Sequence, residues 1–198
     1  SEATDRTAAL GLVPATPIVH DLLDRGGPYR RFTQSRLLIA PPGLDLATLA
    51  GAVGRVLAGH DALRAVFDPV ARTFDVRAAD VVDPAALVRR VDVRGLDERA
   101  RSSVLSEETD VACAALDPAA GAMMRLVFFD TGPDRPGRIL VVIHHLVVDG
   151  VSWRILVPDL AAACEGVEPD GGGTPLRAWA RGLLEQVPAR RGELALWR

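Results

Sequence analysis

A chain of 198 residues is long enough to bury a hydrophobic core as one domain, and its 48% hydrophobic and 25% charged residues exclude a disordered or fibrous protein. All 23 basic residues are arginines scattered along the chain, and the formal net charge is -3. Because a nucleic-acid-binding face needs clustered positive charge, we expect no nucleic-acid partner.

The first half of the chain predicts two helices and three strands. Thr16 before Pro17 is a typical helix start, and Asp45 is a second N-cap ahead of apolar residues at helical spacing. The strands are indicated by runs that contain alternating polar and apolar residues and that are bounded by turn-forming residues. In chain order the predicted segments are a helix over 18–23, a strand over 32–40, a helix over 45–59, and strands over 63–67 and 73–77.

The second half of the chain predicts two central strands between helices. Residues 123–130 and 138–143 are almost wholly apolar, as expected of strands covered on both faces. This alternation of strands and helices, with no internal linker, predicts one α/β domain in which a layered mixed sheet is covered by helices. The predicted helical segments are 84–116, with a short extended stretch over 91–93, then 151–164 and, after a glycine loop at 171–173, 175–197 with a break at Pro188.

The cysteines and the hydropathy of the chain indicate its compartment. Cys113 and Cys164 lie in apolar helical sequence without metal-ligand spacing, which is typical of reduced core thiols. Trp153, Trp179 and Trp197 are interpreted as packing residues. No apolar run approaches the roughly 18 to 20 residues that a membrane span needs, and no secretion leader is recognisable. We therefore expect a cytoplasmic protein without membrane contact.

His144 and His145 stand at the end of the second apolar strand. Neighbouring side chains on a strand point to opposite faces, so only one of the two can serve a given cavity, which disfavours a metal site built from both. A histidine here is suited to general base catalysis, since its neutral form dominates near pH 7. Histidines at strand ends are also often satisfied core residues, so both interpretations stay open. His20 and His60 have no acidic or cysteine partner at ligand spacing and are predicted to be structural.

Asp149 and Gly150 follow the histidines in a predicted turn. The Asp149 carboxylate could accept backbone N–H groups or pair with an arginine, and so hold the loop and the imidazole. Gly150 is suited to a positive φ or to the close approach of a substrate. Ser152 lacks the second glycine of a nucleophile elbow and is predicted to be a helix cap or a first-turn residue.

The stretch H-H-L-V-V-D-G-V-S-W-R-I-L at residues 144–156 resembles the HHxxxDG motif of the condensation-domain superfamily in nonribosomal peptide synthetases. Two further stretches agree with that family in order and position, P-A-T-P-I at residues 14–18 and H-D-A-L-R-A-V-F at residues 60–67. The resemblance covers nearly all of the chain but only the first half of such a domain. It implies that residues 1–198 are an N-terminal lobe, similar to chloramphenicol acetyltransferase, and that the C-terminal lobe is absent.

The resemblance implies roles for the motif residues. His145 would be the active-site base or acid, and His144 would be structural. Asp149, which precedes Gly150 of the motif, would bridge to Arg64 instead of taking part in the chemistry. The substrate would arrive on the phosphopantetheine arm of a peptidyl carrier protein. That cofactor belongs to the partner, and no metal or nucleotide is implied for this chain.

Two stretches resemble one subtype of the family. V-V-D-G-V-S-W-R-I-L after the histidines and F-T-Q-S at residues 32–35 are more similar to epimerization domains than to peptide-bond-forming ones. Inversion at an α-carbon is easiest with a second acid/base on the opposite face, and the family has a glutamate there, in an EGHGR-like motif of the second lobe. That motif is absent here, because Glu165-Gly166 is followed by Val167. The lobe would hold half of a two-base site and be inactive alone.

Two other functions stay open. The chain could be a lobe of a condensing acyltransferase, in which His145 positions or deprotonates the attacking amine. It could also be a free-standing half-domain that binds a carrier protein or a tailoring enzyme without catalysis. An isolated lobe is expected to expose apolar surface, which would favour self-association or a docking face.

Overall fold

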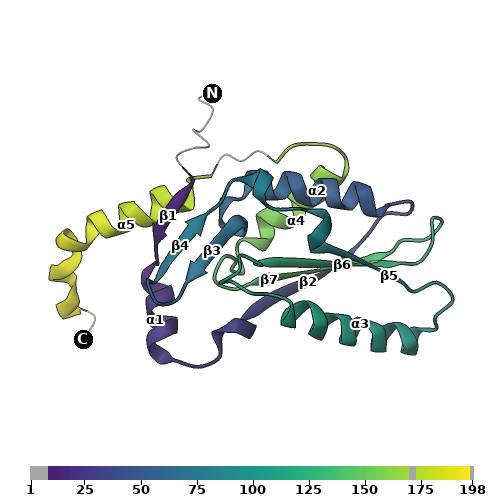
Figure 1. Cartoon of the computed structure of the whole chain (residues 1–198), viewed down its shortest axis with the longest axis horizontal. Coiled ribbons are helices and arrows are strands. Elements are labelled where there is room, and N and C mark those ends of the chain that lie inside the picture. The colour runs from purple at the N-terminus through teal and green to yellow at the C-terminus, as the bar shows by residue number, and fades with distance from the viewer. Residues whose placement is uncertain (1–8, 170–172, 197–198) are drawn as a thin grey trace.

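The computed structural model describes residues 9–169 and 173–196, and its main layer is a four-stranded mixed sheet (Figure 1). The strands are β2 (Thr33–Ile39), β5 (Val88–Asp92), β6 (Met124–Asp130) and β7 (Arg138–His144). Their spatial order is β2-β7-β6-β5. β7 pairs antiparallel with both of its neighbours, whereas β5 runs parallel to β6.

The central strands β6 and β7 are buried along almost their whole length, which confirms the predicted central pair. The predicted helix over 84–116 is wrong over residues 88–92, which form the edge strand β5; the short extended stretch expected over 91–93 coincides with the end of this strand, which begins three residues earlier. Its exposed Arg89 and Arg90 hide the strand pattern in the sequence. The parallel pairing of this strand with β6 joins residues far apart in the chain, which periodicity within a short window does not reveal.

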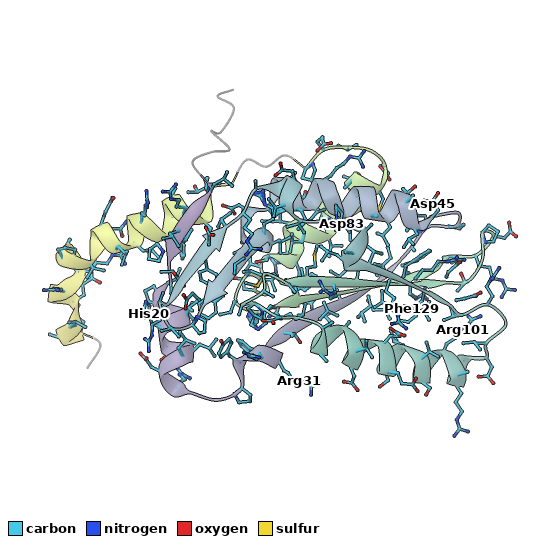
Figure 2. The ribbon with its side chains drawn as sticks, viewed as in Figure 1. His20, Arg31, Asp45, Asp83, Arg101 and Phe129 are labelled. Atoms are coloured by element: carbon cyan, nitrogen blue, oxygen red, sulfur yellow. The ribbon has the colours of Figure 1, made fainter. Side chains whose placement is uncertain are left out.

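Helices cover both faces of the main sheet (Figure 1). On one face lie α2 (Leu46–Gly59) and α4 (Trp153–Cys164), which pack against each other and against alternate residues of β6 and β7. On the other face lies α3 (Glu98–Ala114), which packs against the remaining alternate residues, among them Phe129 (Figure 2). The period-two alternation of the strands thus divides this part of the core into two layers.

A second sheet of three antiparallel strands lies beside the main sheet (Figure 1). Its strands are β1 (Gly11–Pro14), β3 (Ala65–Asp68) and β4 (Thr73–Val76), in the order β1-β4-β3. Apolar residues of this sheet pack with residues of α1 (Pro17–Arg25) and α5 (Leu176–Arg190). The sequence predicted the neighbouring strands β3 and β4 but not β1, which is only four residues long and is ordered by its pairing with β4.

The helix starts follow the signals in the sequence. Asp45 caps α2, because its Oδ1 accepts a hydrogen bond from the backbone N–H of Thr48 at 2.7 Å. Pro17 is the first residue of α1, as predicted, although the side chain of Thr16 makes no capping hydrogen bond. The helix start at Asp45 is therefore confirmed in its capping chemistry, and the start at Thr16 in its position.

The C-terminal segment differs from its prediction at Pro188. The expected break there is wrong, because α5 continues two residues beyond this proline before a 3₁₀ segment at Arg191–Leu196. Pro188 has no N–H to donate to the carbonyl one turn earlier, so the helix loses that hydrogen bond. Because only two residues of α5 follow it, few helical hydrogen bonds beyond the proline can be disrupted. Two residues of the predicted glycine loop, 171 and 172, and Trp197 lie outside the described residues.

The architecture confirms the predicted mixed α/β fold, with the second sheet as an addition. None of the helices in residues 9–169 and 173–196 combines the length and the apolar character needed to cross a membrane. β7 ends at His144, and the connection to α4 begins with His145 and contains the turn that follows it. This connection packs against two apolar clusters. Its residue Val147 contacts the cluster between the main sheet and helices α2 and α4, and also the cluster of the three-stranded sheet.

Candidate active site

His144, the last residue of β7, is fully buried with 0% exposure. Its Nε2 lies 3.0 Å from the carbonyl oxygen of Tyr29, and its Nδ1 accepts the backbone N–H of Leu146 at 3.2 Å. Because a carbonyl oxygen only accepts and an amide N–H only donates, the ring is neutral with its proton on Nε2. Burial lowers the pKa of His144 below its ordinary value. Both ring nitrogens are thus engaged in holding the structure.

His145 has different surroundings and is partly exposed. Its ring stacks on Phe32, with 4.4 Å between the ring centroids and 16° between the planes. Its backbone N–H donates to the carbonyl of Phe32 at 2.8 Å, which extends the pairing of β2 and β7 by one residue. Its Nε2 lies 2.9 Å from Nε2 of Gln34. The two histidines therefore contact different groups, as strand alternation predicted.

Gln34 connects His145 to the first residue of α4. The indole Nε1–H of Trp153 donates to Oε1 of Gln34 at 2.6 Å, while the amide nitrogen of Gln34 faces His145. The guanidinium of Arg36 lies over the Trp153 ring, 4.9 Å from its centroid. Trp153 was predicted as a packing residue, and it is buried, but it is also a hydrogen-bond donor in this cluster.

Sequence reasoning missed Gln34 and Trp153 as site residues. They are 119 positions apart, so no spacing rule connects them. A signal was nevertheless present in F-T-Q-S-R, where Phe32, Gln34 and Arg36 alternate along one strand and so belong to one face. A glutamine whose side chain is partly buried between a strand and a helix needs a polar partner.

Asp149 is joined to the turn that begins α4. Its Oδ1 accepts from the backbone N–H of Val151 at 3.0 Å, and from the N–H and the hydroxyl of Ser152 at 2.8 and 2.7 Å. The hydroxyl oxygen of Ser152 accepts the N–H of Asp149 at 3.1 Å in return. This reciprocal pattern is that of a capping box. The hydrogen bonds from Ser152 lower the pKa of Asp149, and the carboxylate holds the turn from which Trp153 projects.

The pairing of Asp149 with Arg64 stays a prediction. Arg64 is buried, with 7% exposure, at the end of the 3₁₀ helix Asp61–Arg64. Its backbone carbonyl accepts the N–H of Arg77 at 3.3 Å. What the structure establishes for Asp149 is the first of the two roles expected from the sequence, the acceptance of backbone N–H groups.

Gly150 does not have the positive φ that the sequence suggested. The φ angle of Gly150 does not lie in the positive, left-handed range. A Cβ at this position would meet no atom within 4 Å. The turn is closed by the hydrogen bonds from Val151 and Ser152 to Asp149, and these form without a positive φ at Gly150. The close approach of a substrate to Gly150 stays a prediction, since the space beside it is open.

The other histidines have partners that sequence spacing did not reveal. His60, at the end of α2, lies 2.7 Å from Oδ2 of Asp159 on α4, and the two residues are 99 positions apart. His20 on α1 (labelled in Figure 2) accepts from the guanidinium of Arg72 through Nδ1 at 3.1 Å. These contacts connect elements of the fold, in line with a structural role. Within the described ranges, no three His, Cys, Asp or Glu side chains gather as metal ligands.

The geometry thus offers one partly exposed imidazole at a defined position. His145 is held by a stacked ring, by a carboxamide and by a backbone hydrogen bond, all on or next to β2. An imidazole in this setting can accept or donate a proton at a substrate atom that reaches it. Cys113 and Cys164 are free, half-buried thiols, and burial raises the pKa of Cys164, which disfavours a nucleophilic role for that thiol.

A model of the Condensation domain family matches residues 27–185 of the chain. One of the proteins that make up the linear gramicidin synthase of Brevibacillus parabrevis is 34% identical over 211 residues, which covers 100% of this chain and 3% of that protein. The crystal structure of the epimerization domain from the third module of tyrocidine synthetase B has a TM-score of 0.78 at 25% identity, over 95% of this chain.

A more distant likeness extends to a condensation domain. The first condensation domain of the calcium-dependent antibiotic synthetase, in complex with a substrate analogue, has a TM-score of 0.67 at 21% identity over 92% of this chain, which shows a shared fold. The chain spans 45% of that solved chain and 44% of the epimerization-domain chain. It is therefore less than half as long as either of these solved chains.

The buried, neutral His144 predicts a pH-dependent stability. Because its pKa is lower in the folded than in the unfolded chain, its contribution is fully present above about pH 6.5 and is lost as the pH falls toward the folded-state pKa. We expect the free energy of unfolding, measured by denaturant titration, to fall between pH 7 and pH 5. His144→Gln, which does not titrate, should flatten this slope, whereas His20→Gln should retain it. An equal slope in all three proteins would contradict the prediction.

The two roles of Asp149 can be separated by paired variants. If its carboxylate acts through capping, Asp149→Ala should lower the free energy of unfolding by about 1 kcal/mol, and Asp149→Asn, which keeps an acceptor, by only a few tenths. If it also neutralises buried Arg64, both variants should cost about 3 to 5 kcal/mol. Asp134→Ala, in an exposed turn, is the matched control and should stay within about 0.5 kcal/mol of the original protein.

Proposed function

Because the chain belongs to the condensation-domain family, we propose that it is the N-terminal lobe of an epimerization domain in a nonribosomal peptide synthetase. In this role it inverts the α-carbon of an aminoacyl or peptidyl thioester held on a carrier protein. His145 is the acid/base at one face of that carbon. The phosphopantetheine arm that carries the thioester belongs to the carrier protein and enters the site as part of the substrate.

The observation that carries this proposal is the contact between the two stretches that resemble epimerization domains. F-T-Q-S supplies Gln34, and V-S-W-R-I-L supplies Trp153. Their side chains are hydrogen-bonded to each other, and Gln34 is hydrogen-bonded to His145. The features that distinguish this subtype therefore surround the residue that would transfer the proton. The likeness to the tyrocidine epimerization domain, at a TM-score of 0.78, supports the same subtype.

The reaction requires that a weakly acidic C–H bond be broken beside a thioester carbonyl. His145 in its neutral form accepts the α-proton, and the electron pair of the C–H bond enters an enolate. Phe32, which is stacked on the ring, restricts the orientation of the imidazole, which reduces the entropic cost of reaching the transition state. The planar enolate then needs a proton on its opposite face.

The second acid/base is expected from the C-terminal lobe. A single imidazole reaches one face of a planar intermediate. The carboxylate of Asp149 is engaged by the N–H and hydroxyl groups of Ser152, which lower its pKa. It is therefore poorly suited to deliver a proton. By resemblance to the family, a glutamate of the second lobe completes the site, and this lobe alone is inactive.

The partner lobe would also cover apolar surface on the C-terminal helix. α5 extends away from the small sheet at one end of the molecule (Figure 1). Trp179 of this helix was predicted as a packing residue, but it is 52% exposed. We infer that the C-terminal lobe covers this helix, since the chain spans only 44% of a solved epimerization-domain chain. Other exposed apolar residues in this segment are Leu184, Val187, Leu194 and Leu196.

A condensing lobe is the second candidate function. It is favoured by the family model and by the fold shared with the antibiotic-synthetase condensation domain. In that reaction His145 would position or deprotonate the amine that attacks a donor thioester, so the same histidine would serve a different substrate pair. A lobe that only docks a carrier protein is the third candidate, and it would leave His145 without a catalytic task.

Replacement of His145 tests the proposal in a protein that contains both lobes. The protein is mixed in D₂O with a carrier protein that bears an aminoacyl or peptidyl thioester, and exchange of the α-proton is followed by mass spectrometry. His145→Ala should reduce the exchange rate by about 10²- to 10⁴-fold, the usual contribution of a general base. His20→Gln, on α1, should leave it unchanged.

The same proteins separate the three candidates. Unchanged exchange in His145→Ala would reject His145 as the acid/base. Peptide-bond formation between two carrier-bound substrates, lost in His145→Ala and accompanied by no exchange in the original protein, would establish the condensing lobe instead. Binding of the carrier protein with neither reaction in the two-lobe protein would leave docking as the function.

A further inference from the structure

The Trp153–Gln34–His145 contacts determine which atoms donate and which accept. An indole N–H can only donate, so the Gln34 atom 2.6 Å from it must be the carbonyl oxygen. The other end of the carboxamide is then the NH₂ group, which can only donate. This group lies 2.9 Å from Nε2 of His145. Nε2 of His145 must therefore accept, and it accepts with its lone pair.

The polarity of these bonds leaves one tautomer for His145. A neutral imidazole has one N–H and one lone pair, so a lone pair at Nε2 places the proton on Nδ1. A proton on Nε2 would face the N–H of Gln34 and lose the hydrogen bond. The carboxamide cannot turn over to relieve this, because its NH₂ group would then face the indole N–H. His144 has the opposite arrangement, with its proton on Nε2.

The surroundings prevent the cluster from rearranging freely. Trp153 is 5% exposed and begins α4 directly after the turn held by Asp149. Arg36, two residues beyond Gln34 on the same strand, covers the indole ring. Within residues 9–169 and 173–196, Nδ1 of His145 has no hydrogen-bond partner that would favour the other tautomer. The hydrogen bonds of the cluster thus all favour the same tautomer.

We propose that Gln34 and Trp153 are positioning residues that hold His145 as the neutral tautomer with its proton on Nδ1 and its lone pair on Nε2. The consequence for catalysis rests on the proposed function. As the α-carbon of the thioester approaches, its C–H bond breaks, a bond from that proton to Nε2 forms, and the electron pair enters the enolate. The N–H of Gln34 leaves Nε2 as the proton arrives. Gln34 therefore keeps the accepting lone pair at one known atom until the substrate displaces it.

The tautomer is measured directly by ¹⁵N NMR of the 198-residue chain with labelled histidine. The resonances of His145 are identified by their loss in His145→Gln. The original protein should show a lone-pair-bearing Nε2 and a protonated Nδ1 at neutral pH. A protonated Nε2 in the original protein would overturn the inference, whatever the activity of the two-lobe protein.

Three variants separate positioning from a merely structural role. Gln34→Glu replaces the N–H donor by a carboxylate that accepts from both neighbours, so the proton should move to Nε2. Trp153→Phe keeps the ring but removes the indole N–H, so the carboxamide can turn and both tautomers should be populated. Ser35→Ala, the next residue on β2 and on the opposite face, is the control and should leave the tautomer unchanged. A tautomer unaffected by Gln34→Glu would reject the inference.

The catalytic consequence is tested by α-proton exchange in the two-lobe protein. Gln34→Leu removes the donor without introducing a charge, and we expect kcat to fall about tenfold, less than the loss of the base itself. KM for the carrier-bound thioester should change little, since Gln34 acts through His145. An equal kcat would reject the catalytic consequence of the tautomer. Absent exchange in the original two-lobe protein would reject the proposed function but leave the NMR result for the tautomer intact.

Discussion

The antiparallel pairing of β2 with β7 is the constraint on which the candidate site depends. Its register places Thr33 opposite His144, and the backbone N–H of His145 continues the pairing to Phe32. With the period of two along each strand, this register brings Gln34 and Phe32 to the same imidazole. A slip by one residue would replace Gln34 by a side chain from the opposite face. The register that forms the hydrophobic core therefore also determines the surroundings of His145.

The two adjacent histidines show how a strand places neighbouring residues in different surroundings. His144 is enclosed by protein, and both of its nitrogens are engaged by backbone groups of neighbouring segments. Burial disfavours its charged form, so it acts as a neutral connector. His145 lies one position further, at the surface, where only one of its nitrogens is engaged by the described part of the chain. Adjacent residues of the same type thus differ in chemistry because of the face that each one occupies.

The turn after the histidines connects the site to the helical layer. Asp149 binds the N–H groups that begin the turn into α4, and Trp153 follows at the start of that helix. The hydrogen bond from Trp153 to Gln34 then joins this layer to the edge strand of the sheet. The motif residues, Gln34 and Trp153 are therefore parts of one connected arrangement around a single imidazole. In the proposed epimerization domain, a second acid/base would complete this arrangement, and another lobe would cover the exposed apolar residues of α5.

The central apolar strands, the helix start at Asp45, the mixed α/β class and the family were predictable from the sequence, because they depend on local periodicity, capping chemistry and a motif of fixed spacing. The full length of β5 and its pairing with β6, the existence of a second sheet, and the absence of a positive φ at Gly150 came from the three-dimensional structure. It also decided that Gln34 and Trp153, 119 residues apart, meet at His145. The physical reason is that strand pairing and side-chain hydrogen bonds join segments distant in the chain, and no local pattern records which of them become neighbours.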